Sequence, residues 1–233
     1  MLKVVSFKIC PFVQRVTALL DAKNLPYEIE YIDLSDKPQW FLDISPNGQV
    51  PVLITENNTA LFESDAIFEY LEEAYPALQP ELSFEQKAQN QAWSYLASKH
   101  YLVQCSTMRS SNKTTLLERE EKLTKAFAKA EEQLGDGPFF NGTNMSTVDL
   151  AWLPLLHRAA IIEAHTCHDF LANYPKVKAW QQTLSKTGLF ESSVSDDFEQ
   201  MFINFYLSDQ TYLGSISDCK FESSNTCNNN SCC

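Results

Sequence analysis

The strongest constraint on the fold is a change of hydrophobic pattern near residue 80. Residues 1–77 alternate short strand-like and helix-like segments, whereas after Pro80 only helical spacing of apolar residues is found and no strand pattern returns. The sequence therefore predicts two domains, an α+β domain over residues 1–77 and an all-α domain over residues 81–214. Each is long enough to bury a core of its own.

The first domain has the pattern of a small mixed sheet covered by helices. Its first three elements form a β-α-β unit, and Asn57-Asn58 suits a tight turn between two antiparallel strands. The predicted elements, in chain order, are a strand over 2–7, a helix over 12–20, strands over 27–31, 51–55 and 59–62, and a helix over 67–74 that Pro76 ends.

The second domain has helical periodicity throughout. Two long helices are predicted over 83–109 and 116–134. Ser146 is expected to cap a third helix, with Asp149 returning a hydrogen bond to its backbone. Pro154 is expected to kink that helix.

The end of the chain has little apolar content. Residues 215–233 follow the apolar segment 198–206 and are predicted to form a disordered tail. The terminal Cys232-Cys233 pair is similar to a lipidation signal of some eukaryotic proteins. No basic run precedes it, so we favour unmodified thiols.

The charge balance limits the kinds of partner. Thirty acidic side chains against eighteen basic ones give a net charge of −12, which repels phosphate backbones and anionic lipids and argues against nucleic-acid and membrane partners.

We find no export signal and no membrane-spanning run. Seven cysteines, an odd number in a chain this long, do not suggest a disulfide scaffold. We therefore expect a cytoplasmic protein in a reducing compartment.

Cys10 is the strongest candidate nucleophile. It follows a buried strand and precedes Pro11, which suits the first position of a helix, so its sulfur is expected over the first helical turn. Lowering a thiol pKa from near 8.5 to about 6 needs roughly 3.4 kcal/mol, and the helix dipole supplies only about 0.3 to 1 kcal/mol. Backbone N–H groups must supply the rest, and the sequence leaves open whether Arg15 points toward the sulfur. Val13 replaces the second cysteine of a Cys-x-x-Cys pair, which predicts monothiol chemistry. A buried, inert cysteine is the alternative.

Four motifs in order resemble the glutathione-site motifs of cytosolic glutathione transferases, above all the cysteine-type omega class and the plant dehydroascorbate reductases. The resemblance covers nearly the whole chain and implies a thioredoxin-like N-terminal domain followed by an α-helical domain. Residues 137–149 and 174–180 match the helical domain of the family, and 198–207 resembles the extra C-terminal helix of the omega class. The four motifs are Cys10-Pro-Phe-Val-Gln-Arg15, Leu34-Ser-Asp-Lys37-Pro-Gln-Trp40-Phe, Ser45-Pro-Asn-Gly-Gln-Val50-Pro51-Val and Glu63-Ser64-Asp65.

The resemblance implies roles for the residues nearest the reactive group. Cys10 is the implied catalytic cysteine, and Phe12 lines the site beside it. Val50 is expected to offer its backbone N–H and C=O to the cysteinyl part of glutathione, as an added strand would. The family geometry also implies a cis bond between Val50 and Pro51, although a trans Pro51 at a strand edge is the ordinary alternative.

The two ends of glutathione have implied partners of their own. Glu63 is expected to take the ligand's ammonium group. Ser64, at the N-cap of the helix around Ile67, is expected to receive the γ-glutamyl carboxylate. Lys37 and the backbone of Leu34 are expected to hold the glycyl end. Taken singly, Ser64 is better explained as a simple helix cap and Lys37 as a solvated surface charge, whereas the family spacing of the whole set favours the glutathione site.

The function implied is that of a glutathione-dependent thioltransferase or dehydroascorbate reductase, with glutathione as co-substrate and a Cys10–glutathione disulfide as intermediate. Conjugation of glutathione to electrophilic small molecules is an alternative, expected to be weak because Cys10 occupies the place of the activating hydroxyl.

Two further alternatives are a non-catalytic interaction protein, like the stringent-starvation proteins, and a redox-switched membrane-associating protein, like the chloride intracellular channel relatives. The resemblance also implies a homodimer.

The pocket for the small oxidised or electrophilic co-substrate is expected between the domains, on Phe12 and the helices over 83–109 and 149–158. A metal site is not expected, because His165-Thr-Cys167-His168 places its ligands too close together in sequence for a tetrahedral set. A place in the core of the helical bundle is favoured for each of the candidate pocket residues in the helical domain, which are Trp93, Tyr101, Trp152 and Arg158.

Overall fold

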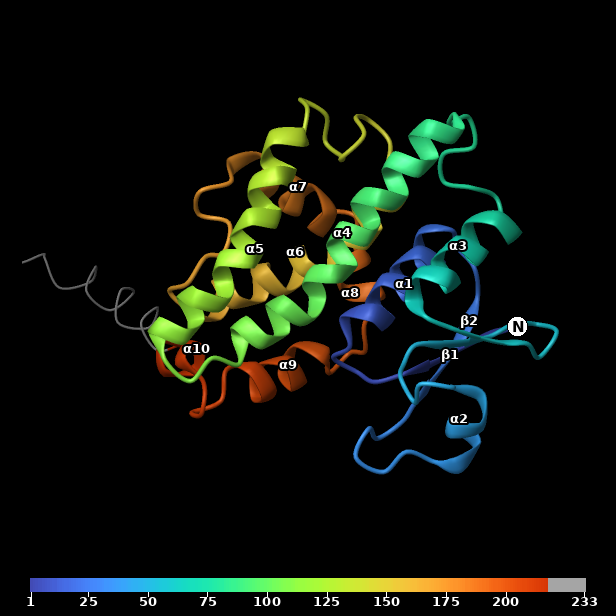
Figure 1. Cartoon of the computed structure of the whole chain (residues 1–233), viewed down its shortest axis with the longest axis horizontal. Helices are drawn as coiled ribbons and strands as arrows, with labels where there is room; N and C mark the ends of the chain where they lie inside the picture. The colour runs from blue at the N-terminus through green and yellow to red at the C-terminus, as the bar shows by residue number, and fades with distance from the viewer. Residues whose placement is uncertain (218–233) are drawn as a thin grey trace, which may run out of the picture.

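The computed structural model describes residues 1–217 of the 233-residue chain (Figure 1). Within these residues the last strand ends at Phe62, and the first of the long helices begins at Phe84. A thioredoxin-like domain with a small mixed sheet, followed by a helical domain, is therefore confirmed. The tail predicted over 215–233 falls, from 218 onward, outside the described residues, and Ser215 belongs to the short helix α10 (Tyr212–Ser215).

The sheet has the strand order β2-β1-β3-β4. The parallel pair β1 (Leu2–Ser6) and β2 (Tyr27–Tyr31) is joined by α1 (Pro11–Ala22), which is the predicted β-α-β unit. The hairpin strands β3 (Val52–Ile54) and β4 (Ala60–Phe62) continue the sheet in antiparallel fashion, with β3 beside β1. Both strands of the hairpin therefore belong to the same sheet as β1, the strand that leads into α1.

Successive residues of β1 face opposite sides of the sheet, as the pleat requires. Val4 belongs to the large core with α1 and α3 (Ser64–Ala74), whereas Val5 packs with Phe41 of α2 (Gln39–Ile44) in a second, smaller cluster. No helix was predicted at the place of α2. This helix covers the face of the sheet that would otherwise expose Val5 to water.

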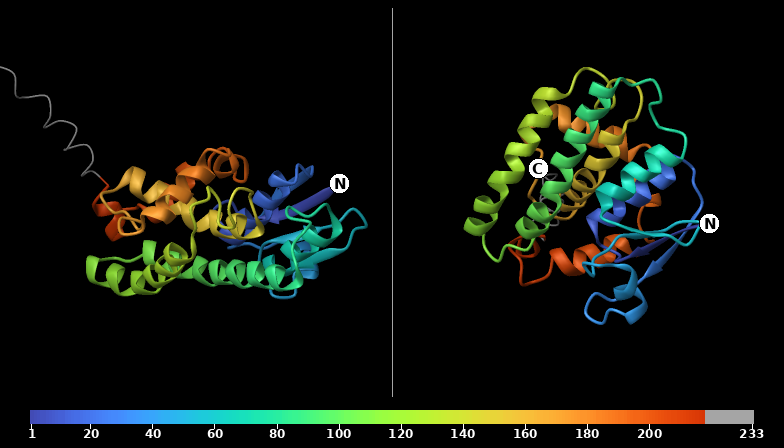
Figure 2. Two further views of the ribbon diagram at one scale, coloured as in Figure 1. Left: turned by 90° about the horizontal axis from the view of Figure 1, so that it is seen from above. Right: turned by 45° about the vertical axis from the view of Figure 1, so that its right-hand side comes forward.

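The helical domain has two layers. In the left view of Figure 2 the green α4 and α5 lie on one side, and the orange α6 to α8 lie on the other. Fourteen of the nineteen residues of α6 are buried, so this helix occupies the centre of the domain. The elements are α4 (Phe84–Met108), α5 (Lys113–Gln133), α6 (Thr147–His165), α7 (Pro175–Ser185), α8 (Leu189–Ser192) and α9 (Phe198–Tyr206).

The predicted cap of α6 is present. The backbone N–H and the hydroxyl of Ser146 donate to one carboxylate oxygen of Asp149, at 2.8 and 2.6 Å. The backbone N–H of Phe140 and the indole N–H of Trp180 donate to the other oxygen, at 2.8 and 2.7 Å. A buried carboxylate is therefore fully hydrogen-bonded, and it joins the start of α6 to α7 and to the preceding loop.

The two domains share one apolar core through α1. Nine of the twelve residues of α1 are buried, because it lies between the sheet and α6. Polar contacts cross the same interface: the amide of Gln14 lies 2.7 Å from Nδ1 of His157 and donates to the hydroxyl of Ser193 at 3.2 Å. The hydroxyl of Thr17 donates to the Ser193 carbonyl at 2.6 Å. The helix that starts at Cys10 is thus fixed from both domains.

Candidate active site

Cys10 caps the N-terminus of α1. It has extended backbone angles, φ −77° and ψ 122°, and Pro11 occupies the first helical position as predicted. The backbone N–H of Cys10 donates to the carbonyl of Phe7 at 3.0 Å, which holds the end of β1 against the start of the helix. The backbone N–H groups of Phe12 and Val13 act on the sulfur and lower the pKa of the thiol. The sulfur therefore lies over the first helical turn, where those N–H groups have no partner within the helix.

Burial outweighs these N–H groups in the electrostatics of the Cys10 thiol. Burial raises its pKa to about 11, whereas the backbone N–H groups of Val13 and Phe12 and the charge of Arg158 lower it. The expectation of a thiol already ionised at neutral pH is therefore not supported. Arg15, whose direction the sequence left open, pairs with Asp65 and stacks on Phe68 with its guanidinium carbon 4.3 Å from the ring centre. It is not among the groups that act on the sulfur.

Arg158 is a buried cation that acts on the Cys10 thiol. Its guanidinium donates to the side-chain carbonyl of Gln14, to the Pro154 carbonyl at 3.0 Å and to the Ile9 carbonyl at 3.1 Å. Within residues 1–217 it forms no salt bridge with a carboxylate. Burial lowers its pKa, and four weakly acidic groups favour its charged form: Cys105, Tyr206, Cys10 and Tyr101. Because guanidinium stays charged in proteins, Arg158 supplies positive charge to a pocket of thiols and phenols.

A small cavity of about 130 Å³ gathers five of the eight predicted site residues. Neither backbone polar group of Val50 takes part in a hydrogen bond within residues 1–217, so both are open to a ligand strand. The Val50–Pro51 peptide bond is cis, as the resemblance implied. The cavity is lined by Phe12, Asn47, Gln49, Val50, Pro51, Glu63 and Ser64.

Glu63 and Ser64 are arranged differently from the prediction. Glu63, and not Ser64, is the N-cap of α3, and its side chain makes no capping hydrogen bond. The prediction of Ser64 as the cap is wrong because the chain turns one residue earlier, at Glu63, which has φ +66°. Such a backbone costs a residue other than glycine about 1 kcal/mol or more and is often found at functional sites. The turn leaves the buried Ser64 as the first helical residue, facing the cavity.

Asn47 orients the Glu63 carboxylate. The amide nitrogen of Asn47 donates to Oε1 of Glu63 at 2.7 Å. Asn47 lies in a turn closed by a hydrogen bond from the backbone N–H of Gly48 to the carbonyl of Ser45 at 2.9 Å. The sequence analysis gave Asn47 no role, although it belongs to one of the four motifs. The exposed carboxylate is left with an oxygen that can take a cationic group.

The two residues predicted for the glycyl end lie outside this cavity. Nζ of Lys37 lies beside Gly48, 3.7 Å from the position that a Cβ on that glycine would take. Lys37 is therefore next to the turn that leads into Val50. Leu34 is exposed, with 37% of its surface accessible, and it does not line the cavity.

A larger pocket of about 600 Å³ also has Phe12 in its wall. It was predicted to draw on α4 and α6, but its helical-domain wall comes from α4, α5 and α9. Tyr101 and Trp152 are core residues, as favoured, and Tyr101 packs edge-on against Phe12 with ring centres 5.0 Å apart. The lining residues are Phe7, Ile9, Cys10, Pro11, Phe12, Leu102, Cys105, Ser106, Arg109, Arg119, Phe205 and Tyr206.

Of these lining residues the sequence analysis named only Cys10 and Phe12 as site residues, although it expected the helix that carries Leu102, Cys105, Ser106 and Arg109 to form part of the wall. Cys105, Arg109 and Arg119 lie far from Cys10 along the chain, so local sequence carries no signal for them. Phe205 and Tyr206 had an available signal, because the apolar segment that forms α9 stands out in the polar C-terminal region. The pocket has no acidic lining residue, although the chain carries a net charge of −12.

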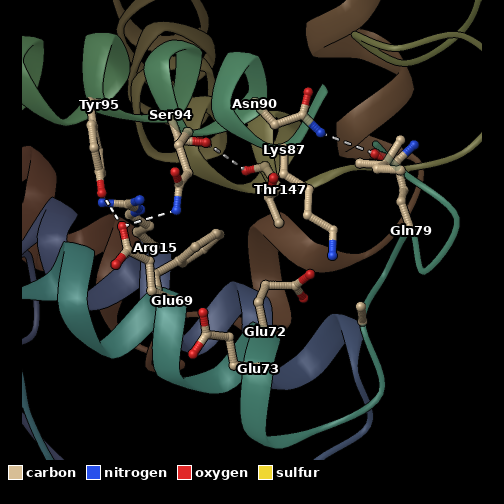
Figure 3. A pocket seen from close by; sticks show the side chains of 14 residues that line it. Arg15, Glu69, Glu72, Glu73, Gln79, Lys87, Asn90, Ser94, Tyr95 and Thr147 are labelled. Carbon is tan, nitrogen blue, oxygen red and sulfur yellow. Dashed lines mark hydrogen bonds between the residues drawn. The ribbon is translucent and has the colours of Figure 1, made fainter. Parts of the chain in front are cut away.

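A third cavity, of about 150 Å³, lies between α3 and α4 (Figure 3). It contains no thiol and none of the predicted site residues. Its polar groups largely satisfy one another: Tyr95 donates to Glu69, and Asn90 donates to Gln79 at 3.3 Å. The two pockets that Phe12 lines are therefore the candidate site.

The histidines near the end of α6 point to different partners. His165 contacts Glu199 at 2.7 Å and His168 contacts Glu120 at 3.3 Å. In the described part of the chain no group of three His, Cys, Asp or Glu side chains is placed to hold a metal ion. No helix of the same part is both long enough and apolar enough to cross a membrane.

Two family models match the chain. One, described as "Glutathione S-transferase, N-terminal domain", covers residues 4–81, and the other, "Glutathione S-transferase, C-terminal domain", covers residues 114–181. The chain is 32% identical to glutathione S-transferase omega-1 of Rattus norvegicus over 213 residues, which is 89% of this chain and 87% of the relative. It is 36% identical over 157 residues to the probable cytosolic glutathione S-transferase DHAR1 of Oryza sativa, which is 67% of this chain and 70% of the relative.

Solved structures show the same fold. The glutathione transferase Omega 3C of Trametes versicolor has a TM-score of 0.72 and 26% identity, over 84% of this chain and 89% of that one. The rice enzyme OsGSTU1, solved in complex with glutathione, has a TM-score of 0.76 and 21% identity, over 88% of this chain and 94% of that one. At 21% identity the second match concerns the fold alone.

Proposed function

Because this chain belongs to the glutathione S-transferase family, we propose that it is a cysteine-type member that uses glutathione to reduce small oxidised molecules. The relatives named omega-1 and DHAR1 support a glutathione-dependent activity. The substrates proposed are mixed disulfides of glutathione and dehydroascorbate. The reaction is therefore thiol–disulfide exchange or a two-electron reduction in which two glutathione molecules supply the electrons.

The observation that carries the proposal is that Cys10 lines the larger pocket, which shares Phe12 with the small cavity. The small cavity around Val50 and Glu63 suits one peptide-sized ligand, and the larger pocket opens to solvent. Phe12 lines both, and Cys10 lies two residues before it. A glutathione held in the small cavity and a substrate in the large one would thus meet at a single sulfur.

The residues of the small cavity complement the functional groups of glutathione. The open N–H and C=O of Val50 pair with the cysteinyl backbone, in the manner of strand addition. Glu63, oriented by Asn47, takes the ligand's ammonium group. Ser64 and the free N–H groups of the first turn of α3 take the γ-glutamyl carboxylate, where the helix dipole favours negative charge. Lys37 lies close enough to the Gly48 turn to hold the glycyl carboxylate.

The proposed reaction begins with attack of the Cys10 thiolate on the glutathione sulfur of a mixed disulfide. The Cys10–glutathione disulfide forms, and the other thiol leaves with the proton. A second glutathione then attacks the glutathione sulfur of this intermediate, which regenerates Cys10 and releases glutathione disulfide. With dehydroascorbate, two glutathione molecules supply the two electrons and the products are ascorbate and glutathione disulfide.

Burial of the thiol affects the pH dependence of this reaction. Because burial raises the pKa of Cys10 to about 11, only a small fraction is thiolate at neutral pH. The helix-start N–H groups and Arg158 stabilise that thiolate, and they also stabilise the negative charge that is shared between sulfurs during exchange. The rate of the first step is therefore expected to rise with pH.

Parallel assays test the proposal. Reduction of hydroxyethyl disulfide and of dehydroascorbate by glutathione should proceed with the wild-type protein and be lost with Cys10→Ala. Conjugation of glutathione to an aromatic electrophile, run beside them, should be slower than either. Turnover that survives Cys10→Ala, or no turnover in the first two assays, would contradict the proposal and favour conjugation or a non-catalytic protein, respectively.

Glutathione binding is tested separately by calorimetry on the inactive Cys10→Ala protein. Glu63→Ala and Ser64→Ala should each weaken binding by about 1.5 to 3 kcal/mol, the usual scale of a charge-assisted hydrogen bond. Ser185→Ala, an exposed serine at the end of α7, is the matched control and should bind normally. Equal affinity in all variants would contradict the assignment of this cavity.

The homodimer stays a prediction from the resemblance, and the cytoplasmic location stays a prediction from the cysteine content of the chain. Light scattering coupled to size-exclusion chromatography tests the dimer. A mass of about 26.5 kDa would be that of the monomer.

A further inference from the structure

Two free thiols face the same pocket. Within residues 1–217 the free cysteines are Cys10 and Cys105, and both are partly exposed. They come from different domains, Cys10 from the start of α1 and Cys105 from the last third of α4, yet both line the 600 Å³ pocket. The prediction of monothiol chemistry rested only on Val13, which replaces the second cysteine of a Cys-x-x-Cys pair.

The packing of α1 against α4 places the two sulfurs near each other. The Phe12 ring contacts the Tyr101 ring, with centres 5.0 Å apart. Cys105 is four residues after Tyr101 and therefore lies one helical turn along the same face of α4. The two thiols are close enough for a charge on Cys105 to act on Cys10.

The surroundings of Cys105 suit thiol exchange. The hydroxyl of Tyr206 hydrogen-bonds to its sulfur, and the positive charge of Arg158 acts on both Cys105 and Cys10. A phenol and a guanidinium that face a pair of sulfurs stabilise negative charge on either one. The same groups therefore support transfer of charge from an attacking sulfur to a leaving one.

We propose that Cys105 is a resolving cysteine for the Cys10–glutathione intermediate. The inference rests on the proposed function, because it needs that intermediate to form. The Cys105 sulfur attacks the Cys10 sulfur, the bond between Cys10 and glutathione breaks, and a Cys10–Cys105 disulfide forms. Glutathione leaves as the thiol and carries away the proton of Cys105. No further oxidant is required, since both electrons removed from the protein are those that reduced the first disulfide.

A thiol in the same pocket competes well with free glutathione. An intramolecular reactant acts at a high effective concentration when the geometry permits the reaction. The Cys10–Cys105 disulfide would then be reduced by two glutathione molecules, the first forming a mixed disulfide and the second releasing glutathione disulfide. The enzyme would thus work as a dithiol, without a Cys-x-x-Cys motif.

Peptide mapping tests the inference. The reduced, full-length protein is treated with a small excess of glutathione disulfide, quenched with acid and N-ethylmaleimide, and digested with trypsin without reductant. Cleavage after Lys8, Arg15, Lys99 and Arg109 gives peptides 9–15 and 100–109, each with one cysteine. We expect these two peptides to be recovered linked to each other.

Two variants separate a resolving role from a structural one. In Cys105→Ser the linked species should be lost, and peptide 9–15 should carry glutathione instead, which also shows that the variant is folded and reactive. Ser106→Ala, next to Cys105 in the same pocket, should still give the linked peptides.

The outcomes for the wild-type protein distinguish the two proposals. If peptide 9–15 carries glutathione and no linked species is found, Cys105 is not a resolving cysteine, but the proposed function stands. If peptide 9–15 is neither linked nor modified by glutathione, the proposed intermediate does not form, and both proposals fail.

Discussion

Alkylation of Cys10 measures the balance between burial and the backbone N–H groups at the start of α1. Burial raises the pKa of this thiol from 9.0 to about 11, against the N–H groups of Val13 and Phe12 and the charge of Arg158. At pH 7 the thiolate fraction is then about 10⁻⁴, roughly a hundredfold below that of a thiol with an unshifted pKa. The shift corresponds to about 3 kcal/mol of net cost for the charged form.

The assay is the rate of iodoacetamide reaction between pH 6.5 and 10.5, read from peptide 9–15. Because only the thiolate reacts, the rate should rise about tenfold for each pH unit across this range, with no plateau. Free glutathione, measured in the same buffers, gives the profile of an unburied thiol. Circular dichroism at each pH checks that the protein stays folded.

Arg158 provides a matched pair of variants for the same assay. Arg158→Met removes the positive charge and should lower the alkylation rate at every pH, whereas Arg158→Lys keeps the charge and should lower it less. A wild-type rate that levels off below pH 8 would refute the reasoning. It would mean that the N–H groups and Arg158 together outweigh burial.

Two other predictions concern strain and protonation. Glu63→Gly should raise the free energy of unfolding by about 1 kcal/mol, because glycine adopts φ +66° without strain. The same substitution should weaken glutathione binding. A variant that is less stable than the wild type in urea denaturation would contradict the strain argument. Burial lowers the pKa of His157 to about 3, below the value near 6.5 expected in the unfolded chain. Stability due to this neutral histidine is therefore complete above pH 6.5 and decreases as the pH falls toward 3, by about 2 kcal/mol between pH 6 and 4.5. His157→Gln should remove that part of the slope in denaturation curves, and parallel curves for both proteins would count against it.

Local patterns predicted the scaffold because the physics behind them is local. The alternation in β1 and the helical spacing of α1 follow from side-chain geometry, and the Ser146–Asp149 cap lies within one turn. Pro11 fixes where α1 begins, and so places Cys10. Each of these features depends on residues no more than a few positions apart.

The features that the sequence could not provide depend on distant contacts. The strained turn at Glu63 moved the cap of α3 by one residue, and the short helix α2 is held by the apolar side of the sheet. The protonation of Cys10 depends on burial by both domains and on Arg158, nearly 150 positions away in the sequence. Cys105 enters the pocket only because α4 packs across the start of α1.

The sharing of α1 by both domains has a consequence for how the protein unfolds and how it can be divided. Gln14 and Thr17 face Ser193 and His157, so separating the domains would expose a second apolar side of α1 together with unpaired polar groups. Heat should therefore melt the chain in one cooperative transition in a calorimeter. A fragment ending near residue 80 would lose the partner surface of the helix that begins at Cys10, and it would aggregate rather than act as a minimal oxidoreductase.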